Sequence, residues 1–138
     1  MNKSISNKIL FQSVSALIQE AQQIVVRNVN TTMLITYFEI GKMIVEEELN
    51  GKQRAEYAKQ VVLQLSIDLT KEFGRGYSKS NLEYMRQFYK TYQKRIVQSV
   101  IGQSQFPFSL SWTHYIQLLK IESEAERSFY EIEATQNH

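Results

Sequence analysis

The chain contains no cysteine, a single proline and only five glycines among its 138 residues. The lack of cysteine excludes disulfides and thiolate metal sites, and it fits a reducing compartment. So few prolines and glycines favour a helical protein with few turns over a sandwich or a barrel. No apolar run reaches the length of a membrane span, and we expect no secretory signal peptide. These absences predict a chain with no membrane partner.

Groups that carry catalysis are also scarce. Asp68 is the sole aspartate, and the histidines are His114 and the terminal His138. Metal-dependent nucleases hold Mg²⁺ with clustered carboxylates beside a lysine, yet no Asp-x-Lys or Glu-x-Lys triplet occurs. Histidine pairs with zinc spacing and a phosphate-binding glycine loop are missing too. We therefore expect no cofactor, no metal and no catalytic residue, and we interpret His114 as a packing residue.

Charge is distributed unevenly along the chain. The net charge is +2, but residues 71–95 hold seven basic residues against Glu72 and Glu83, a net +5, so the remainder sums to −3. Glu46, Glu47 and Glu48 form one acidic cluster, and further glutamates lie near the C-terminus. A basic centre between acidic flanks is more informative than the total charge.

Apolar residues recur at three- and four-residue spacing through most of the chain, which is typical of amphipathic helices. The residues 10–25 and 33–45 follow this pattern, and Asn30 to Thr32 between them leave open a short break or one long helix. Gly41 lies on the apolar face of the second run, so we expect another helix to approach closely there. Later helices are predicted to begin near Gln53, at Ser78 or Ser80, at Ser109 or Ser111, and at Ser123.

The C-terminal third is harder to interpret. Two short β-prone runs, Ile96 to Ile101 and Gln105 to Phe108, allow a small hairpin or a loop within residues 96–108. The last helix is expected to turn Ala125, Phe129 and Ile132 inward. The pattern as a whole predicts an all-α fold of five or six helices in a single domain spanning residues 1–138.

The segment from Leu65 to Tyr92 carries the main functional signal. Its helix, its break at Gly74-Arg75-Gly76 and its second helix match the outline of a helix-turn-helix, which can lay its second helix on nucleic acid. One arc of that second helix is apolar and aromatic, which indicates core packing more than base stacking. A neighbouring arc is basic. The predicted nucleic-acid-binding residues are Arg75, Lys79, Asn81, Arg86, Lys90 and Lys94.

Each of these residues has a predicted role and an alternative. Lys79, Arg86 and Lys90 would contact phosphates, Arg75 would assist from the turn, and Asn81 would approach a base. Alternatively, the basic arc is a solvated helix face with intrahelical ion pairs to Glu83.

Three segments together resemble a known family: Tyr37-Phe38-Glu39-Ile40-Gly41, Phe73-Gly74-Arg75-Gly76-Tyr77-Ser78 and Leu110-Ser111-Trp112-Thr113-His114-Tyr115. The chain resembles, from about residue 14 onward, the N-terminal helical domain of the YhcG-type PD-(D/E)xK nucleases. One departure is Phe38, where the family usually has tryptophan. The resemblance implies a bacterial, cytoplasmic, DNA-associated protein with a C-terminal nuclease domain in full-length relatives. We expect this chain to be that domain separated from its nuclease.

Two functional hypotheses follow from these observations. The first is a non-catalytic DNA-binding domain that targets a nuclease. The second is a protein-interaction or homo-oligomerisation domain, which the long N-terminal helices and the acidic clusters favour. A stand-alone enzyme is least favoured, because the carboxylate and histidine constellations of known hydrolytic sites are missing.

Overall fold

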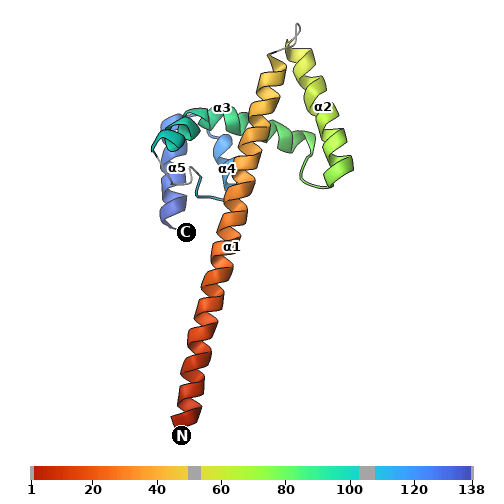
Figure 1. The fold of residues 1–138 in the computed structure, drawn as a ribbon. Coiled ribbons are helices and arrows are strands. Elements are labelled where there is room, and N and C mark those ends of the chain that lie inside the picture. The colour runs from red at the N-terminus through yellow and green to blue at the C-terminus, as the bar shows by residue number, and fades with distance from the viewer. Residues whose placement is uncertain (1, 50–53, 103–107, 138) are drawn as a thin grey trace.

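The computed structural model describes residues 2–49, 54–102 and 108–137, with side chains described for residues 7–49, 56–94 and 108–137. These residues form helices and no strand: α1 (Asn2–Glu48), α2 (Arg54–Phe73), α3 (Lys79–Gly102), α4 (Trp112–Leu119) and α5 (Glu124–Gln136) (Figure 1). The predicted all-α fold is confirmed. In the part of the chain that the structure describes, no helix combines the length and the apolarity that a membrane crossing needs.

Helix α1 is one continuous helix. It passes through Asn30 to Thr32 without a break, and Thr36 Oγ1 donates to the Thr32 carbonyl at 2.8 Å. Its 47 residues give a length of about 70 Å at the standard rise per residue. The N-terminal half projects away from all the other helices (Figure 1). We call residues 7–29 the arm, because the body begins at Asn30, whose Nδ2 donates to the Leu110 carbonyl at 3.0 Å.

The C-terminal half of α1 packs against α3, which crosses it at close range (Figure 1). Gly41 lies at the crossing: a Cβ built on it would lie 2.1 Å from the Met85 carbonyl oxygen and 3.0 Å from Tyr89 Cβ. Only a glycine lets the two backbones come so near. The close approach predicted at Gly41 is confirmed.

The core lies along the predicted apolar arc of α3. Leu82, Met85, Phe88 and Tyr92 are buried there, and Tyr89 is half-buried. One cluster of buried residues joins α3 to α1, α4 and the segment before α4: Leu34, Phe38, Phe88, Tyr92, Phe108, Leu110, Tyr115, Leu118 and Leu119. A second cluster joins α3 to α1 and α2: Ile44, Val62, Leu82 and Met85. The aromatic residues of α3 therefore serve mainly as core.

Turn and cap residues set the helix limits. Gly74 and Gly76 have φ values of 82° and 108°, which glycine adopts readily, so α2 ends at Phe73. Ser78 Oγ accepts a bond from Asn81 N at 3.1 Å, so Ser78, and not Ser80, caps the start of α3. Ser111 and Ser123 cap α4 and α5 in the same way.

The hairpin within residues 96–108 is not found among the described residues. Helix α3 continues to Gly102, so the run Ile96 to Ile101 is helical and not a strand. Residues 103–107, which hold most of the second run, lie outside the described residues. A short β-branched run is compatible with a strand or with a helix. Here it continues α3, whose hydrogen-bonded turns are already formed by the preceding residues.

The predicted inward face of α5 is also wrong. Phe129 and Ile132 are 57% and 56% exposed, and Ala125 is exposed as well. The opposite face packs instead: the Tyr115 hydroxyl donates to Glu131 Oε2 at 2.8 Å, and Arg127 Nη1 donates to the Ile121 carbonyl at 2.8 Å. Polar contacts to α4 and its following turn orient this short helix, and hydrophobic spacing alone does not reveal them.

Candidate nucleic-acid interface

The basic arc of α3 faces away from the core. Lys79, Lys90 and Lys94 are exposed, and their spacing places them on one side of the helix with Glu83 and Arg86. Within the residues whose side chains are described, no ion pair joins Glu83 to these lysines. The arc therefore presents ammonium groups to solvent, which is the arrangement a phosphate-binding face requires.

Arg86 differs from the lysines because it is tied to the end of α1. Its Nε donates to Glu48 Oε1 at 2.5 Å, and the Glu48 side chain is only 10% exposed. The Arg86 side chain is 34% exposed, so part of its guanidinium still faces solvent. Sequence reasoning missed this contact, because the two residues lie 38 positions apart. The pair joins α3 to the C-terminal end of α1.

Replacing Arg86 with alanine is expected to lower the free energy of unfolding by about 1–3 kcal/mol, since the nearly buried Glu48 carboxylate would lose its charged partner. Lys90→Ala on the same arc should change it by less than about 0.5 kcal/mol, because Lys90 is exposed. Urea unfolding followed by the fluorescence of Trp112, the sole tryptophan, measures both. Equal midpoints for the two variants would show that the ion pair contributes nothing.

Asn81 uses its side chain within the fold. Its Nδ2 donates to the Gly76 carbonyl at 2.6 Å, and its Oδ1 accepts a bond from Trp112 Nε1 at 2.8 Å. The residue is half-buried. These two bonds connect the α2–α3 turn, the start of α3 and the start of α4. The structure therefore places Asn81 where it organises the first turn of the candidate interface.

Arg75 lies in the turn that precedes the arc. It is exposed, and glycines with positive φ flank it on both sides. The turn is held to α2 by Ser66 Oγ, which donates to the Tyr77 carbonyl at 2.7 Å. Arg75 thus extends the basic surface from α3 onto an ordered turn.

Residues that could hold a metal do not gather in the described structure. No group of three or more histidine, aspartate or glutamate side chains of suitable geometry occurs among the described residues. His114 is exposed, and its Nδ1 lies 2.8 Å from Oγ of Ser111, the residue that caps α4. The contact fits a hydrogen-bonded role for His114, but the residue lies exposed at the surface and not in the core, so the packing part of the interpretation is wrong.

A second surface, absent from the sequence prediction, is an apolar groove between α1 and α2. Its volume is about 670 Å³. Apolar side chains of both helices line it, among them Ile40, Met43, Ile44, Leu65, Leu69 and Phe73. At its rim the Tyr57 hydroxyl donates to Glu47 Oε1 at 2.7 Å, and this bond raises the pKa of Tyr57. The apolar face of each helix can be recognised in the sequence. The sequence does not indicate that the two faces leave a groove between them.

The fold and these surfaces define an all-α domain in which α3 presents a basic arc and α1 extends into a bare arm. The chain belongs to the family described as the DUF1016 N-terminal domain, which matches residues 13–138. It is 36% identical over 141 residues to an Escherichia coli (strain K12) protein named "Putative nuclease YhcG", which confirms the resemblance. The match covers 85% of this chain but 38% of that relative's length. No solved structure matches the chain.

Proposed function

We propose that this chain is a single helical domain that binds DNA and directs a PD-(D/E)xK nuclease domain to it in the bacterial cytoplasm. The observation that carries the proposal is the arc of exposed lysines on α3, Lys79, Lys90 and Lys94. Support comes from the relative's name, since a nuclease acts on nucleic acid. The domain itself supplies binding and no catalytic group.

Some of the predicted residues would contact DNA, and others hold those residues in position. The three lysines neutralise phosphates, and Arg75 adds a charge from the turn. Arg86 contributes the exposed part of its guanidinium while it holds Glu48. Asn81 is assigned to positioning the start of α3, because its amide is already bonded to Gly76 and Trp112. Such contacts give affinity without sequence preference.

The Lys79→Ala, Lys90→Ala double variant tests the proposal. Two lost phosphate contacts should weaken binding to duplex DNA by about 10- to 100-fold near 0.1 M salt and lower the salt slope by about 1.8. Fluorescence anisotropy of a labelled duplex over a series of salt concentrations measures both quantities. Arg86 is kept in this variant, so that the ion pair to α1 stays intact.

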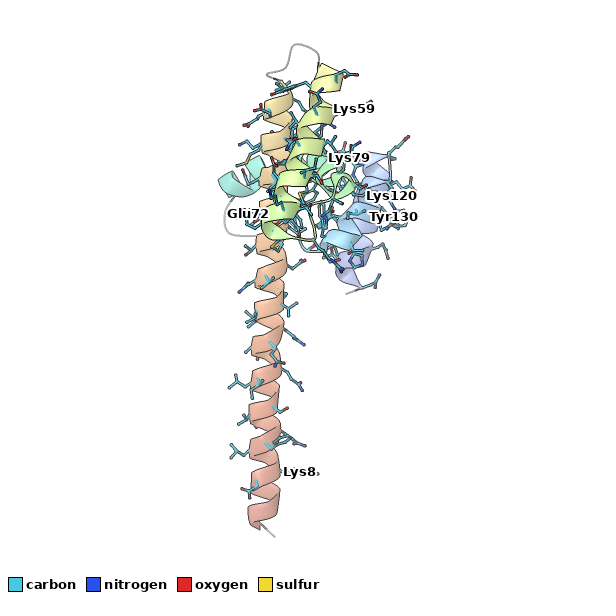
Figure 2. All side chains as sticks on the ribbon, turned by 90° about the vertical axis from the view of Figure 1, so that its right-hand side faces the viewer. Lys8, Lys59, Glu72, Lys79, Lys120 and Tyr130 are labelled. Atoms are coloured by element: carbon cyan, nitrogen blue, oxygen red, sulfur yellow. The ribbon has the colours of Figure 1, made fainter. Side chains whose placement is uncertain are left out.

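The matched control removes two exposed lysines elsewhere, Lys8 near the free end of the arm and Lys120 after α4 (Figure 2). It carries the same net charge and should bind like the parent. No binding by the parent, or equal weakening in both variants, contradicts the proposed interface. Stronger binding to single-stranded DNA or to RNA contradicts a duplex target.

A second candidate function is protein interaction, and the bare arm favours it. Large apolar side chains along the arm are more than 40% exposed, including Phe11 at 71% and Leu17 at 67%. Soluble proteins rarely expose long contiguous apolar surfaces unless another protein or a ligand covers them. DNA binding through α3 and protein contact through α1 use different surfaces, so both can hold.

A further inference from the structure

The arm carries one continuous apolar stripe that nothing in the described structure covers. The stripe recurs every three positions as single residues or adjacent pairs, so its members lie on one side of the helix. All are exposed: Leu10, Phe11, Val14, Leu17, Ile18, Ala21, Ile24 and Val25. Figure 2 shows this part of α1 standing clear of the other helices. The stripe is therefore available to a partner along its whole length.

The junction between the arm and the body lacks the composition that would hold a helix together alone. Residues 24–32, IVVRNVNTT, consist mainly of β-branched residues and asparagines, which are mediocre helix formers. Isolated helices are marginal in water, and most helical stability in proteins comes from packing an apolar face. We therefore expect that packing of the apolar stripe against a partner stabilises this part of α1.

The spacing of the stripe matches a coiled-coil seam. Six residues alternate by four and three positions, which assigns Val14, Ala21 and Asn28 to a positions and Leu10, Leu17 and Ile24 to d positions. Val14 at a with Leu10 and Leu17 at d matches the combination that favours two strands, and the polar Asn28 at a fixes the register. The seam therefore has the features of a two-stranded pairing.

We propose that the arm pairs in parallel, and in register, with the arm of a second copy of this chain. In that arrangement Asn28 meets Asn28 of the second copy, whereas an antiparallel pairing of the same seam sets it against Leu10. The charged residues of the arm, Lys8, Glu20 and Arg27, lie outside the seam, so like charges do not meet across it. An isologous contact of this kind closes a two-fold dimer.

The surface is large enough for a dimer. Seven large apolar side chains, at roughly 60–120 Å² each, offer on the order of 600 Å² per chain. A standard stable interface buries about 800 Å² per partner, of which only part is apolar. The stripe supplies most of that area before its flanking polar residues are included.

This inference rests on the protein-interaction candidate and is independent of DNA binding. The two proposals fail separately, because a chain that stays monomeric can still bind duplex DNA through α3. Likewise, a dimer that ignores DNA leaves the pairing of the arms intact.

Light scattering over a concentration series tests the pairing. The parent should have twice the mass of one chain, and Leu17→Glu in the seam should give a monomer. Gln19→Glu, two residues further on and outside the seam, makes the same charge change and should remain dimeric. Fluorescence of Trp112 confirms that the body is folded in each variant.

The absence of cysteine permits a test of direction. A single Leu10→Cys substitution should form a disulfide-linked dimer on mild oxidation, because parallel pairing brings the two Leu10 positions together. Gln12→Cys, on the outer side of the arm, should crosslink at least 10-fold less. A monomeric parent overturns the proposal, as does a dimer that Leu17→Glu leaves intact. Equal crosslinking of the two cysteine variants overturns the parallel register.

Discussion

Phe88→Ala is expected to lower the free energy of unfolding by about 3–5 kcal/mol, a large share of the 5–15 kcal/mol typical of a domain. Phe88 is completely buried. Its ring centroid lies between 4.7 and 6.1 Å from five other aromatic rings, those of Phe38, Tyr92, Phe108, Trp112 and Tyr115. These neighbours come from α1, α3, α4 and the segment before α4. A cavity at this point would loosen every contact of α3 at once.

Thermal unfolding followed by Trp112 fluorescence measures the effect, since the Trp112 ring lies 5.1 Å from Phe88. The expected fall in Tm is roughly 10 °C or more. The control is Phe129→Ala, the same substitution at a residue that is 57% exposed on α5. It should cost less than about 1 kcal/mol. Similar Tm values for the two variants would mean that the aromatic cluster does not carry the stability of the body.

The core and the candidate interface occupy opposite sides of one helix. The arc of α3 that holds Phe88 is anchored to three other helices, and the reverse side presents Lys79, Lys90 and Lys94. A helix supported in this way keeps its exposed side chains at fixed spacing. Because ordered contacts cost less conformational entropy on binding, a well-packed α3 favours the proposed binding to phosphates.

Much of this fold could be predicted from local sequence signals. The three-four spacing on α3 identified its buried arc, and serine caps with glycine stops located most helix limits. Gly41 on an apolar face correctly indicated a close helix crossing. Each of these signals depends on residues within a few positions of one another, which is why sequence alone reveals it.

The features that escaped prediction depend on distant residues. Phe129 and Ile132 face solvent because a bond from Tyr115 to Glu131 turns α5 the other way. The helical state of residues 96–102 could not be chosen from a short β-branched run. Tertiary contacts decide both cases, and a single sequence does not display them.

The same distinction applies to the candidate site. The exposure of Lys79 and Lys90 followed from their position opposite the apolar arc. The bonds of Asn81 to Trp112 and of Arg86 to Glu48 span 31 and 38 positions, so spacing on α3 gave no sign of them. Two of the six predicted residues therefore also have structural partners, which is why the binding test leaves both unchanged.

Gly41→Ala sets two effects of opposite sign against each other. Helix propensity alone would stabilise α1 by about 1 kcal/mol, because glycine is a poor helix former. However, the added Cβ would lie 2.1 Å from the carbonyl oxygen of Met85 and 2.7 Å from its carbonyl carbon. These are backbone atoms of α3, which cannot rotate away as a side chain would. The helices must separate, and we expect a net loss of about 1–3 kcal/mol or more.

Urea unfolding of Gly41→Ala beside Lys42→Ala measures the balance. Lys42 is exposed on the next position of α1, so its substitution reports propensity without a clash. The midpoint should fall for Gly41→Ala and stay within about 0.5 kcal/mol of the parent for Lys42→Ala. A higher midpoint for Gly41→Ala would mean that propensity wins and that α1 and α3 can move apart at little cost. A larger residue, as in Gly41→Leu, should then also be tolerated, whereas a fixed crossing predicts that this variant fails to fold.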